Sequence, residues 1–237
     1  MKCVIMQPTY LPWSGYFNLI SQADVFVFLD DGQYERSSWQ NRNRVLVDGK
    51  AQWLTVPARR LELSQAFNTV QVDDKRGWRQ KHFRLIKQTY GKHRHGSEIL
   101  DVVSGITDPA VIGLVDLNTK LILEFSRRLD LTPRFVRSSE IGISGQRSER
   151  LLRICEHFGC DEYLSPKGAA EYLARDKVFD DAPVKLSFQQ FAVNPYPQNK
   201  NPVFVESLSI VDVVANLGWI RAREYILGRY SPTLEDI

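Results

Sequence analysis

Short apolar runs alternate with amphipathic stretches along most of this chain. The runs are rich in valine, phenylalanine and leucine and are too short to be helices, so they predict buried strands. These strands are expected over residues 2–6, 24–30, 51–58, 134–139, 161–165 and 184–191. Between them, hydrophobic residues recur at the three- or four-residue spacing of helices. Helices are expected over residues 14–22, 77–90, 108–129, 146–159, 209–218, from 166 and, at the periphery, from 219.

The order of these elements predicts the fold class. Strands that alternate with helices form parallel sheets, because each helix crosses a face of the sheet from one strand to the next. We therefore expect an α/β protein with a mostly parallel, doubly wound, Rossmann-like sheet, of which a nucleotidyltransferase-type or HUP-like sheet is one form. No linker interrupts the pattern, so residues 1–237 are expected to form a single domain. Within it we expect a helical insertion at about 76–130 and a C-terminal helical tail at about 207–237.

Polar and proline residues mark several of the expected helix starts, and glycines mark two of the ends. The expected starts are Ser14, Asp108 with Pro109, Ser165 with Pro166, and Ser209 with Asp212 in a capping box. The expected ends are Gly159 and Gly218. The basic loop 91–97 is the best candidate for a linker in this chain, and we expect it to join parts of one domain.

The composition is that of an ordinary soluble globular protein, with 43% hydrophobic and 25% charged residues. No segment approaches the ~20 consecutive apolar residues of a membrane span, and the N-terminus lacks the apolar run of a signal peptide. The three cysteines are odd in number and lack the spacing of zinc ligands, so reduced thiols and a cytoplasmic location are expected. A net charge of +3, from 31 basic and 28 acidic residues, does not by itself indicate nucleic-acid binding.

Two adjacent carboxylates, Asp30 and Asp31, follow the second expected strand. In open α/β sheets, ligands bind beyond the carboxyl ends of the strands, so this pair and loop 7–13 are expected at the same edge. The pair is a candidate catalytic site that could hold Mg²⁺, bind a sugar hydroxyl or act as a base. The alternative is that one aspartate caps a turn, since Asp-Asp-Gly is common turn chemistry, and that the other is solvated.

A dense polar segment spans residues 36–44. Its candidate binding residues are Arg36, Trp39, Gln40, Asn41, Arg42, Asn43 and Arg44. In a strand, Arg42 and Arg44 would share one face, opposite the two asparagines. Two guanidinium groups on one face suit a phosphate, and Trp39 would stack on a base or a sugar ring. The alternative is a polar loop that carries surface arginines.

Small hydroxyl residues at two further strand ends indicate a possible anion site. Ser138 and Ser139 end one strand, and Arg147 lies in the segment that leads into the next helix. Ser165 and Lys167 repeat the arrangement after another strand. Backbone N–H groups at such helix starts bind anions, although plain N-capping is their commoner use.

The histidines offer no recognisable metal site, and no protein-held metal is expected. His82 and His157 fall within amphipathic helices, whereas His93 and His95 form a pair in the basic loop, where a zinc ion would need further ligands. The chain also has no dinucleotide-binding glycine motif, P-loop or nucleophile elbow.

These features together resemble the WbqC-like proteins. The resemblance covers nearly the whole chain and is carried by QPTYLPWSGYFNLISQADVFVFLDDGQYERSSWQNRNRV, WLTVPA, SSE, RLLRICEHFGCDEYLSPKGAAEYL and LSIVDVVANLGW. Genes of this bacterial family lie in O-antigen and other surface-polysaccharide clusters, so the resemblance implies a role in lipopolysaccharide biosynthesis. For the family, attachment of glycine or another amino-acid-derived group to an amino sugar has been suggested. The chain departs from the family pattern at Pro166 and Lys167, where glycine is more usual.

The resemblance points to residues 7–16, 30–31 and 36–44. In nucleotidyltransferase-type α/β domains, an HxGH sequence occupies the place that PWSGY occupies here, after the first strand. By that analogy, glycine lets a nucleotide phosphate approach the helix N-terminus and a tyrosine hydroxyl reach it. The candidate binding residues of this loop are Gln7, Tyr10, Trp13, Gly15 and Tyr16. The alternative is that the aromatic side chains pack the helix onto the sheet while the prolines stiffen the turn.

Three functions are consistent with these features. The first is a transferase that attaches an amino-acid-derived, glycyl-type acyl group to a nucleotide-activated amino sugar, with Mg²⁺ arriving with the nucleotide as the one cofactor considered. Asp30 or Asp31 would position or deprotonate the acceptor amine. The second is a nucleic-acid-binding or nucleic-acid-modifying protein, and the third is a non-catalytic partner in a polysaccharide assembly complex. For the transferase, the acyl donor is left open between an aminoacyl-adenylate, a CoA thioester, a charged tRNA and a free amino acid with ATP.

Overall fold

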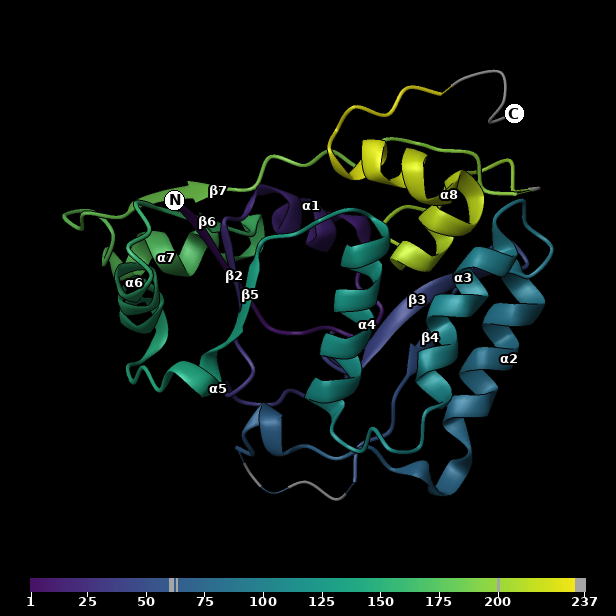
Figure 1. Ribbon diagram of the computed structural model, residues 1–237, viewed down its shortest axis with the longest axis horizontal. Helices are drawn as coiled ribbons and strands as arrows, with labels where there is room; N and C mark the ends of the chain where they lie inside the picture. The colour runs from purple at the N-terminus through teal and green to yellow at the C-terminus, as the bar shows by residue number, and fades with distance from the viewer. Residues whose placement is uncertain (60–61, 63, 200, 233–237) are drawn as a thin grey trace.

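The computed structural model describes residues 1–59, 62, 64–199 and 201–232. Its central sheet has five parallel strands in the order β5-β2-β1-β6-β7 (Figure 1). These strands are β1 (Lys2–Met6), β2 (Val25–Phe28), β5 (Arg134–Arg137), β6 (Glu162–Ser165) and β7 (Lys185–Phe188). Counted along the chain among themselves, they lie in the order 3-2-1-4-5, which is the order of doubly wound sheets. The expected α/β fold with a parallel, Rossmann-like sheet is confirmed.

Helices cover both faces of this sheet. The α-helices are α1 (Ser14–Gln22), α2 (Trp78–Tyr90), α3 (Gly96–Val103), α4 (Leu114–Arg128), α5 (Ser138–Ile141), α6 (Arg147–His157), α7 (Ala170–Asp176) and α8 (Ile210–Ile226). Short 3₁₀ helices are η1 (Phe67–Thr69), η2 (Asp74–Arg76), η3 (Ser104–Thr107) and η4 (Lys167–Ala169). In Figure 1, α6 and α7 lie on one side of the sheet, whereas α2, α3 and α4 lie on the other.

Each face of the sheet has its own hydrophobic core. Along β1, Val4 belongs to the larger core with α1, α4 and α8, whereas Cys3 and Ile5 belong to the smaller core with α6 and α7. This alternation follows from the two-residue period of strands, in which successive side chains point to opposite faces. Burial on both faces explains why the strands are almost uninterrupted apolar runs.

Two further strands lie outside the central sheet. They are β3 (Arg42–Val47) and β4 (Lys50–Thr55), which pair antiparallel in a separate hairpin. The turn residues Asp48 and Gly49 have φ values of 48° and 74°. Two positive φ values are typical of the type I′ turn that Asp-Gly favours. The expectation that residues 51–58 extend the central sheet is therefore wrong, because this turn folds the strand back onto its neighbour in sequence.

The long central helix begins later than expected, at Leu114 instead of Asp108. The chain before it is extended because its backbone pairs with an earlier segment. The N–H of Val72 donates to the carbonyl of Ile112, and the N–H of Leu114 donates to the carbonyl of Val70. These tertiary hydrogen bonds outweigh the local helix-start signal.

Two other helix starts differ from the sequence expectation. Trp13, not Ser14, is the N-cap residue of α1, and its side chain makes no capping hydrogen bond. Ser165 stays within β6, and the helical turn that follows begins at Lys167 as a 3₁₀ helix.

Helix α8 is capped as expected but continues past its expected end. The side chain of Ser209 accepts a backbone N–H of the first turn. The expected capping-box partner, Asp212, instead points into the core. It accepts hydrogen bonds there from the side chains of Tyr90, Tyr196 and Gln198. Gly218, with φ of 71°, interrupts the helix without ending it, since the chain continues helically to Ile226.

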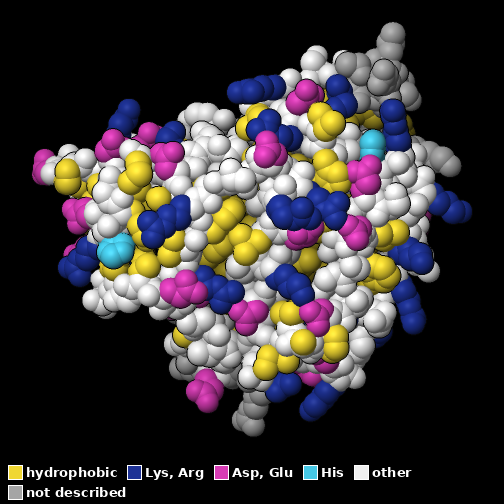
Figure 2. Space-filling model, viewed as in Figure 1, with side chains coloured by type: hydrophobic (Ala, Val, Ile, Leu, Met, Phe, Trp, Pro, Cys, Tyr) yellow, Lys and Arg dark blue, Asp and Glu magenta, His cyan; other side chains and the backbone are white. Residues whose placement is uncertain are grey.

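The surface of the molecule carries charges of both signs. Figure 2 shows basic and acidic side chains interspersed over the middle of one face, with basic side chains along its right-hand edge. Across the part of the chain that the structure describes, no helix has the length and hydrophobicity that crossing a bilayer requires. All three cysteines are buried free thiols.

Candidate functional site

The strand order places a topological switch point between β1 and β6 at the carboxyl edge of the sheet. The chain after β1 leads into α1 on one face, and the chain after β6 leads into α7 on the other. In doubly wound sheets, ligands bind at this switch point, because the two connections diverge there. Gln7 follows β1, Ser165 ends β6, and exposed Lys167 lies just beyond. The fold therefore brings these three predicted residues to one edge.

Asp30 joins the end of β2 to the start of α5. Its side chain is 1% exposed and accepts hydrogen bonds from Oγ of Ser138 at 3.1 Å and from Oγ of Ser139 at 2.7 Å. The backbone N–H of Ser139 donates to the same carboxylate at 3.0 Å. The anion at the start of α5 is thus the protein's own carboxylate, and the two predicted serines bind Asp30.

Asp31 is the more accessible of the two aspartates, with a side chain that is 25% exposed. Its carboxylate accepts a hydrogen bond from Oγ of Ser138 and pairs with Arg150 of α6, both at 2.6 Å. Burial acts to raise the pKa of Asp31, but the hydrogen bonds from Arg150 and Ser138 and the charge of Arg150 outweigh it and lower the pKa. Asp31 is therefore a stable anion and a weak base.

Asp31 could also contact a metal ion, because each of its oxygens accepts one hydrogen bond and keeps a free lone pair. Within the described ranges, no three His, Cys, Asp or Glu side chains are grouped to hold a metal. Mg²⁺ is commonly bound by one or two carboxylates together with substrate phosphates. The residues present therefore fit a Mg²⁺ ion that arrives with a nucleotide.

The loop after β1 packs against the start of α1. The indole of Trp13 lies over Gly15, where an added Cβ would be 2.2 Å from the ring. Gly15 and Tyr16 are buried, and the Tyr16 hydroxyl donates to the carbonyl of Gln7 at 3.1 Å. In this conformation the indole occupies the space that the glycine leaves, so phosphate approach at that point stays a prediction.

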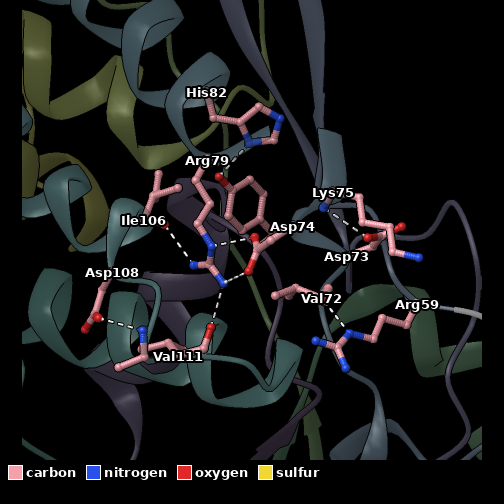
Figure 3. Close-up of polar contacts among 12 residues, drawn as sticks. Arg59, Val72, Asp73, Asp74, Lys75, Arg79, His82, Ile106, Asp108 and Val111 are labelled. Atoms are coloured by element: carbon pink, nitrogen blue, oxygen red, sulfur yellow. Dashed lines mark hydrogen bonds and ion pairs between the residues drawn. The ribbon is translucent and has the colours of Figure 1, made fainter. Parts of the chain in front are cut away.

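Tyr10, from the same loop, enters a buried polar cluster beside α2. Figure 3 shows His82 and Arg79 of this cluster. The Tyr10 hydroxyl lies 3.0 Å from Nδ1 of His82. Burial raises the pKa of Tyr10 and lowers the pKa of His82 to about 4, so both side chains are neutral near pH 7. Next to them, Arg79 pairs with Asp74 and donates to two backbone carbonyls near the start of α4. This cluster ties α2 to its surroundings through groups that are already paired.

The amide side chains of segment 36–44 hold the loops of this edge together. They are Gln40, Asn41 and Asn43, and each is at most 6% exposed. Gln40 donates to the side chain of Gln7 at 3.0 Å, and Asn43 donates to two carbonyls of the loop after β1. Fully buried Asn118 of α4 donates to one carbonyl in each segment. The NH₂ groups of these amides are therefore used within the protein, whereas Oδ1 of Asn41 and Oδ1 of Asn118 accept no hydrogen bond from a described residue.

The two arginines of this segment share one face of the hairpin, as the strand alternation predicts. Their Cζ atoms lie 4.2 Å (Arg42) and 5.7 Å (Arg44) from the ring centroid of Trp53. Trp53 is 42% exposed, and its ring lies 5.4 Å from that of Trp39, which is 47% exposed. We call these four residues the arginine–tryptophan face. Arg44 donates to the carbonyl of Ser207, whereas Arg42 has no hydrogen bond or ion pair with any described residue.

A series of contacts joins this face to the switch point between β1 and β6. Gln7 lies beside Gly32, where an added Cβ would be 3.4 Å from its Nε2. Gln7 also accepts the hydrogen bond from Gln40, and the N–H of Tyr10 donates to the carbonyl of Trp39. The candidate site therefore extends from the switch point and Asp31 along this edge to the arginine–tryptophan face.

Two predicted residues lie apart from these contacts. Arg36 and Arg147 are both exposed and make no ion pair with another described residue. The sequence predicts that Arg147 reinforces an anion site at the start of its helix, but the arginine that pairs with Asp31 is Arg150, three residues further along α6.

Sequence reasoning missed three residues that shape the site, namely Arg150, Trp53 and Asn118. Arg150 lies in the same SGQRSER stretch as Arg147, and only the register of the helix distinguishes them. Trp53 stands opposite Arg44 across the hairpin, a pairing that the Asp-Gly turn could have indicated. Nothing in the sequence distinguishes Asn118 from a surface asparagine.

Comparison with known proteins identifies a family and one relative that match most of the chain. The profile of the WbqC-like protein family matches residues 7–224. The uncharacterized protein Rv1507c of Mycobacterium tuberculosis is 30% identical over 221 residues, which cover 92% of this chain and 94% of that protein. No solved structure matches. The family match includes every candidate residue described above, and the chain belongs to the WbqC-like protein family.

Proposed function

We propose that this protein is a transferase of bacterial surface-polysaccharide biosynthesis. It attaches an amino-acid-derived, glycyl-type acyl group to the amino group of a nucleotide-activated amino sugar, in the manner suggested for O-antigen formation. The observation that carries the proposal is the Arg42 guanidinium. It stacks on exposed Trp53 and makes no hydrogen bond or ion pair with a described residue. A forked guanidinium suits a diphosphate, and an exposed indole suits a nucleotide base.

The substrate in this proposal lies along the edge described above. Its nucleotide end contacts the arginine–tryptophan face, and its amino sugar reaches the switch point beside Asp31. Gln7 and Lys167 follow the two strands that flank the switch point. A Mg²⁺ ion bound with the nucleotide would neutralise diphosphate charge, and Asp31 is the side chain that could contact it.

Asp31 has a positioning role in this proposal. With its lowered pKa it is too weak a base to remove a proton from an amine at neutral pH. As an anion, it accepts a hydrogen bond from the amino group and stabilises the positive charge that develops on nitrogen during attack on the acyl carbon. A new N–C bond forms, the bond from the acyl carbon to its leaving group breaks, and the amine proton leaves with that group or to solvent.

The proposal also places the protein in the cytoplasm. The buried thiols of Cys3, Cys155 and Cys160 are unpaired, as is usual for proteins of reducing compartments.

The proposal is tested by assaying the purified protein for amide formation. UDP- and dTDP-linked amino sugars are incubated with each class of acyl donor, and mass spectrometry detects the acylated sugar. We expect product with one donor class, and at least tenfold less product with Arg42→Ala at substrate concentrations below KM. A loss of one charge-assisted hydrogen bond, about 1.5–3 kcal/mol, corresponds to at least that factor.

The matched control is Arg153→Ala, since Arg153 is exposed on α6 and donates only to the carbonyl of Ser144. The control should retain full activity. Turnover by the isolated protein would exclude a purely non-catalytic role in a larger complex. Equal activity of Arg42→Ala and the wild type would contradict the proposed binding mode.

A further inference from the structure

The positive charge of the chain is concentrated in one stretch, residues 75–97. This stretch contains eight basic residues and no acidic residue. They are Lys75, Arg76, Arg79, Lys81, Arg84, Lys87, Lys92 and Arg94. The remaining 23 basic and 28 acidic residues give the rest of the chain a net charge of −5. The net charge of +3 is therefore the sum of a strongly basic segment and a net acidic remainder of the chain.

Helix α2 presents three of these positive charges on its outer side. Its apolar residues, with His82 and Arg79, face the core, whereas Lys81, Arg84 and Lys87 are exposed. Lys81 and Arg84 lie three residues apart and therefore neighbour each other along one face. Figure 1 shows α2 at the right-hand side of the molecule, and Figure 2 shows a row of Lys and Arg side chains along that edge.

No described residue pairs with the cations on this surface. Lys81, Arg84, Lys87 and Lys92 make no hydrogen bond or ion pair with their side chains among residues 1–59, 62, 64–199 and 201–232. Arg84, Lys87, Lys92 and Gln88 line a groove of about 480 Å³. Like charges held this close repel one another, so an anionic partner would relieve that repulsion. We call Lys81, Arg84, Lys87 and Lys92 the basic face.

The chemistry of the basic face favours a nucleic acid over a membrane. A helix that lies in a bilayer surface presents large apolar side chains toward the lipid. The exposed side chains of α2 are all polar, since Gln80 and Gln88 stand beside the cations. Lysine, arginine and glutamine side chains are the usual partners of phosphate oxygens in a nucleic-acid backbone.

We propose that the basic face binds the phosphate backbone of an RNA that carries the acyl group, so that the donor of the transfer is an aminoacylated RNA. This identification of the donor rests on the proposed transferase function. In the transfer, the amino-sugar nitrogen forms an amide bond with the acyl carbon. The ester bond from that carbon to the ribose oxygen breaks. The ribose oxygen takes up the proton that the amine releases and leaves as a hydroxyl group. No oxidant or further co-reactant is needed.

The proposal is tested by fluorescence anisotropy of labelled, unfractionated bacterial transfer RNA at about 50 and about 200 mM salt. The variant Lys81→Gln/Arg84→Gln/Lys87→Gln removes three charges and keeps helix propensity, because glutamine, lysine and arginine are similar helix formers. The control Arg153→Gln/Arg175→Gln/Lys185→Gln removes three charges from exposed positions at the α6–α7–β7 end of the molecule. Both variants should retain the wild-type circular dichroism and nucleotide-sugar affinity.

We expect the wild type and the control to bind RNA, and the α2 variant to bind at least tenfold more weakly at the lower salt concentration. The slope of log affinity against log salt should fall by about 2 to 3, since each lost phosphate contact contributes about 0.7 to 0.9. Equal weakening in both variants would overturn the proposal, because it would reflect net charge alone. Preference for vesicles of equal parts phosphatidylglycerol and phosphatidylcholine over RNA would also overturn it.

The two proposals fail in distinguishable ways. Nucleotide-sugar binding without RNA binding would overturn the RNA donor and leave the transferase. RNA binding that depends on the basic face, without nucleotide-sugar binding or acyl transfer, would support the basic face and overturn the transferase.

Discussion

Mild acid is expected to destabilise this fold through His82. The imidazole is 8% exposed and lies between Tyr10, whose hydroxyl is 3.0 Å from Nδ1, and Trp78, whose ring centroid is 5.1 Å away. Burial lowers the pKa of His82 from 6.5 to about 4. The folded state therefore binds this proton less readily than the unfolded state does.

The size and sign of the effect follow from this difference in pKa. The lowering of this pKa from 6.5 to about 4, at about 1.4 kcal/mol for each tenfold change in proton affinity, corresponds to about 3 kcal/mol of unfolding free energy. This stability is fully present above the unfolded pKa of 6.5 and is lost as the pH falls toward about 4. It is a large part of the 5–15 kcal/mol that is typical of folded domains, about a third of the middle of that range.

The measurement is urea denaturation at about pH 7 and about pH 4.5, with His82→Gln and the control His157→Gln. The wild type and the control should lose about 2–3 kcal/mol more than His82→Gln over this interval. Comparison with the variant is needed because burial raises the pKa of Asp212, which has the opposite effect on stability. Equal losses in the wild type and His82→Gln would refute the reasoning.

Three further substitutions test other parts of the structure. Gly15→Ala should destabilise the protein by about 1–3 kcal/mol in urea denaturation, because the new methyl group collides with the indole of Trp13. Addition of Trp13→Ala should recover part of that cost, and strict additivity would contradict the contact. Asn118→Ala should cost about 2–4 kcal/mol, because it leaves two buried carbonyls without donors; a cost below about 0.5 kcal/mol would contradict this role. Asp31→Asn should lower acyl transfer at least tenfold while calorimetry shows unchanged nucleotide-sugar affinity, and a parallel loss of both would contradict its positioning role.

The central sheet was predictable because its strands are buried on both faces. Burial of this kind makes each strand a short apolar run, and the intervening helices imply parallel connections. The order of the strands was not predictable, because it depends on packing between segments far apart in sequence. The switch point between β1 and β6 therefore appears only in the folded chain.

The errors in element boundaries have tertiary causes. The pairing of residues 112–114 with residues 70–72 keeps the start of the central helix extended, although Asp108 and Pro109 form a good local start signal. The hairpin has a local cause. The Asp-Gly turn at residues 48–49 turns the chain back, so that β4 pairs with β3 and does not join the central sheet.

The structure shows where the candidate residues lie, while their roles stay predictions. The loop after β1, Asp31 and the arginine segment do lie along one connected edge. The sequence could not separate exposed arginines from buried amides, because both are polar residues in the same segment. Nor could it show that Asp30 is bound by serines from another strand end, since that contact spans more than a hundred residues.

The most direct test of the central claim is calorimetric titration of the protein with UDP- and dTDP-linked amino sugars. The wild type and Arg153→Ala should bind one of them saturably. Arg42→Ala should bind it at least tenfold more weakly, and Arg42→Lys should recover only part of that loss, because an ammonium group lacks the fork that grips a diphosphate. Equal affinity in the wild type and Arg42→Ala, or no binding by any of the four proteins, would contradict the account.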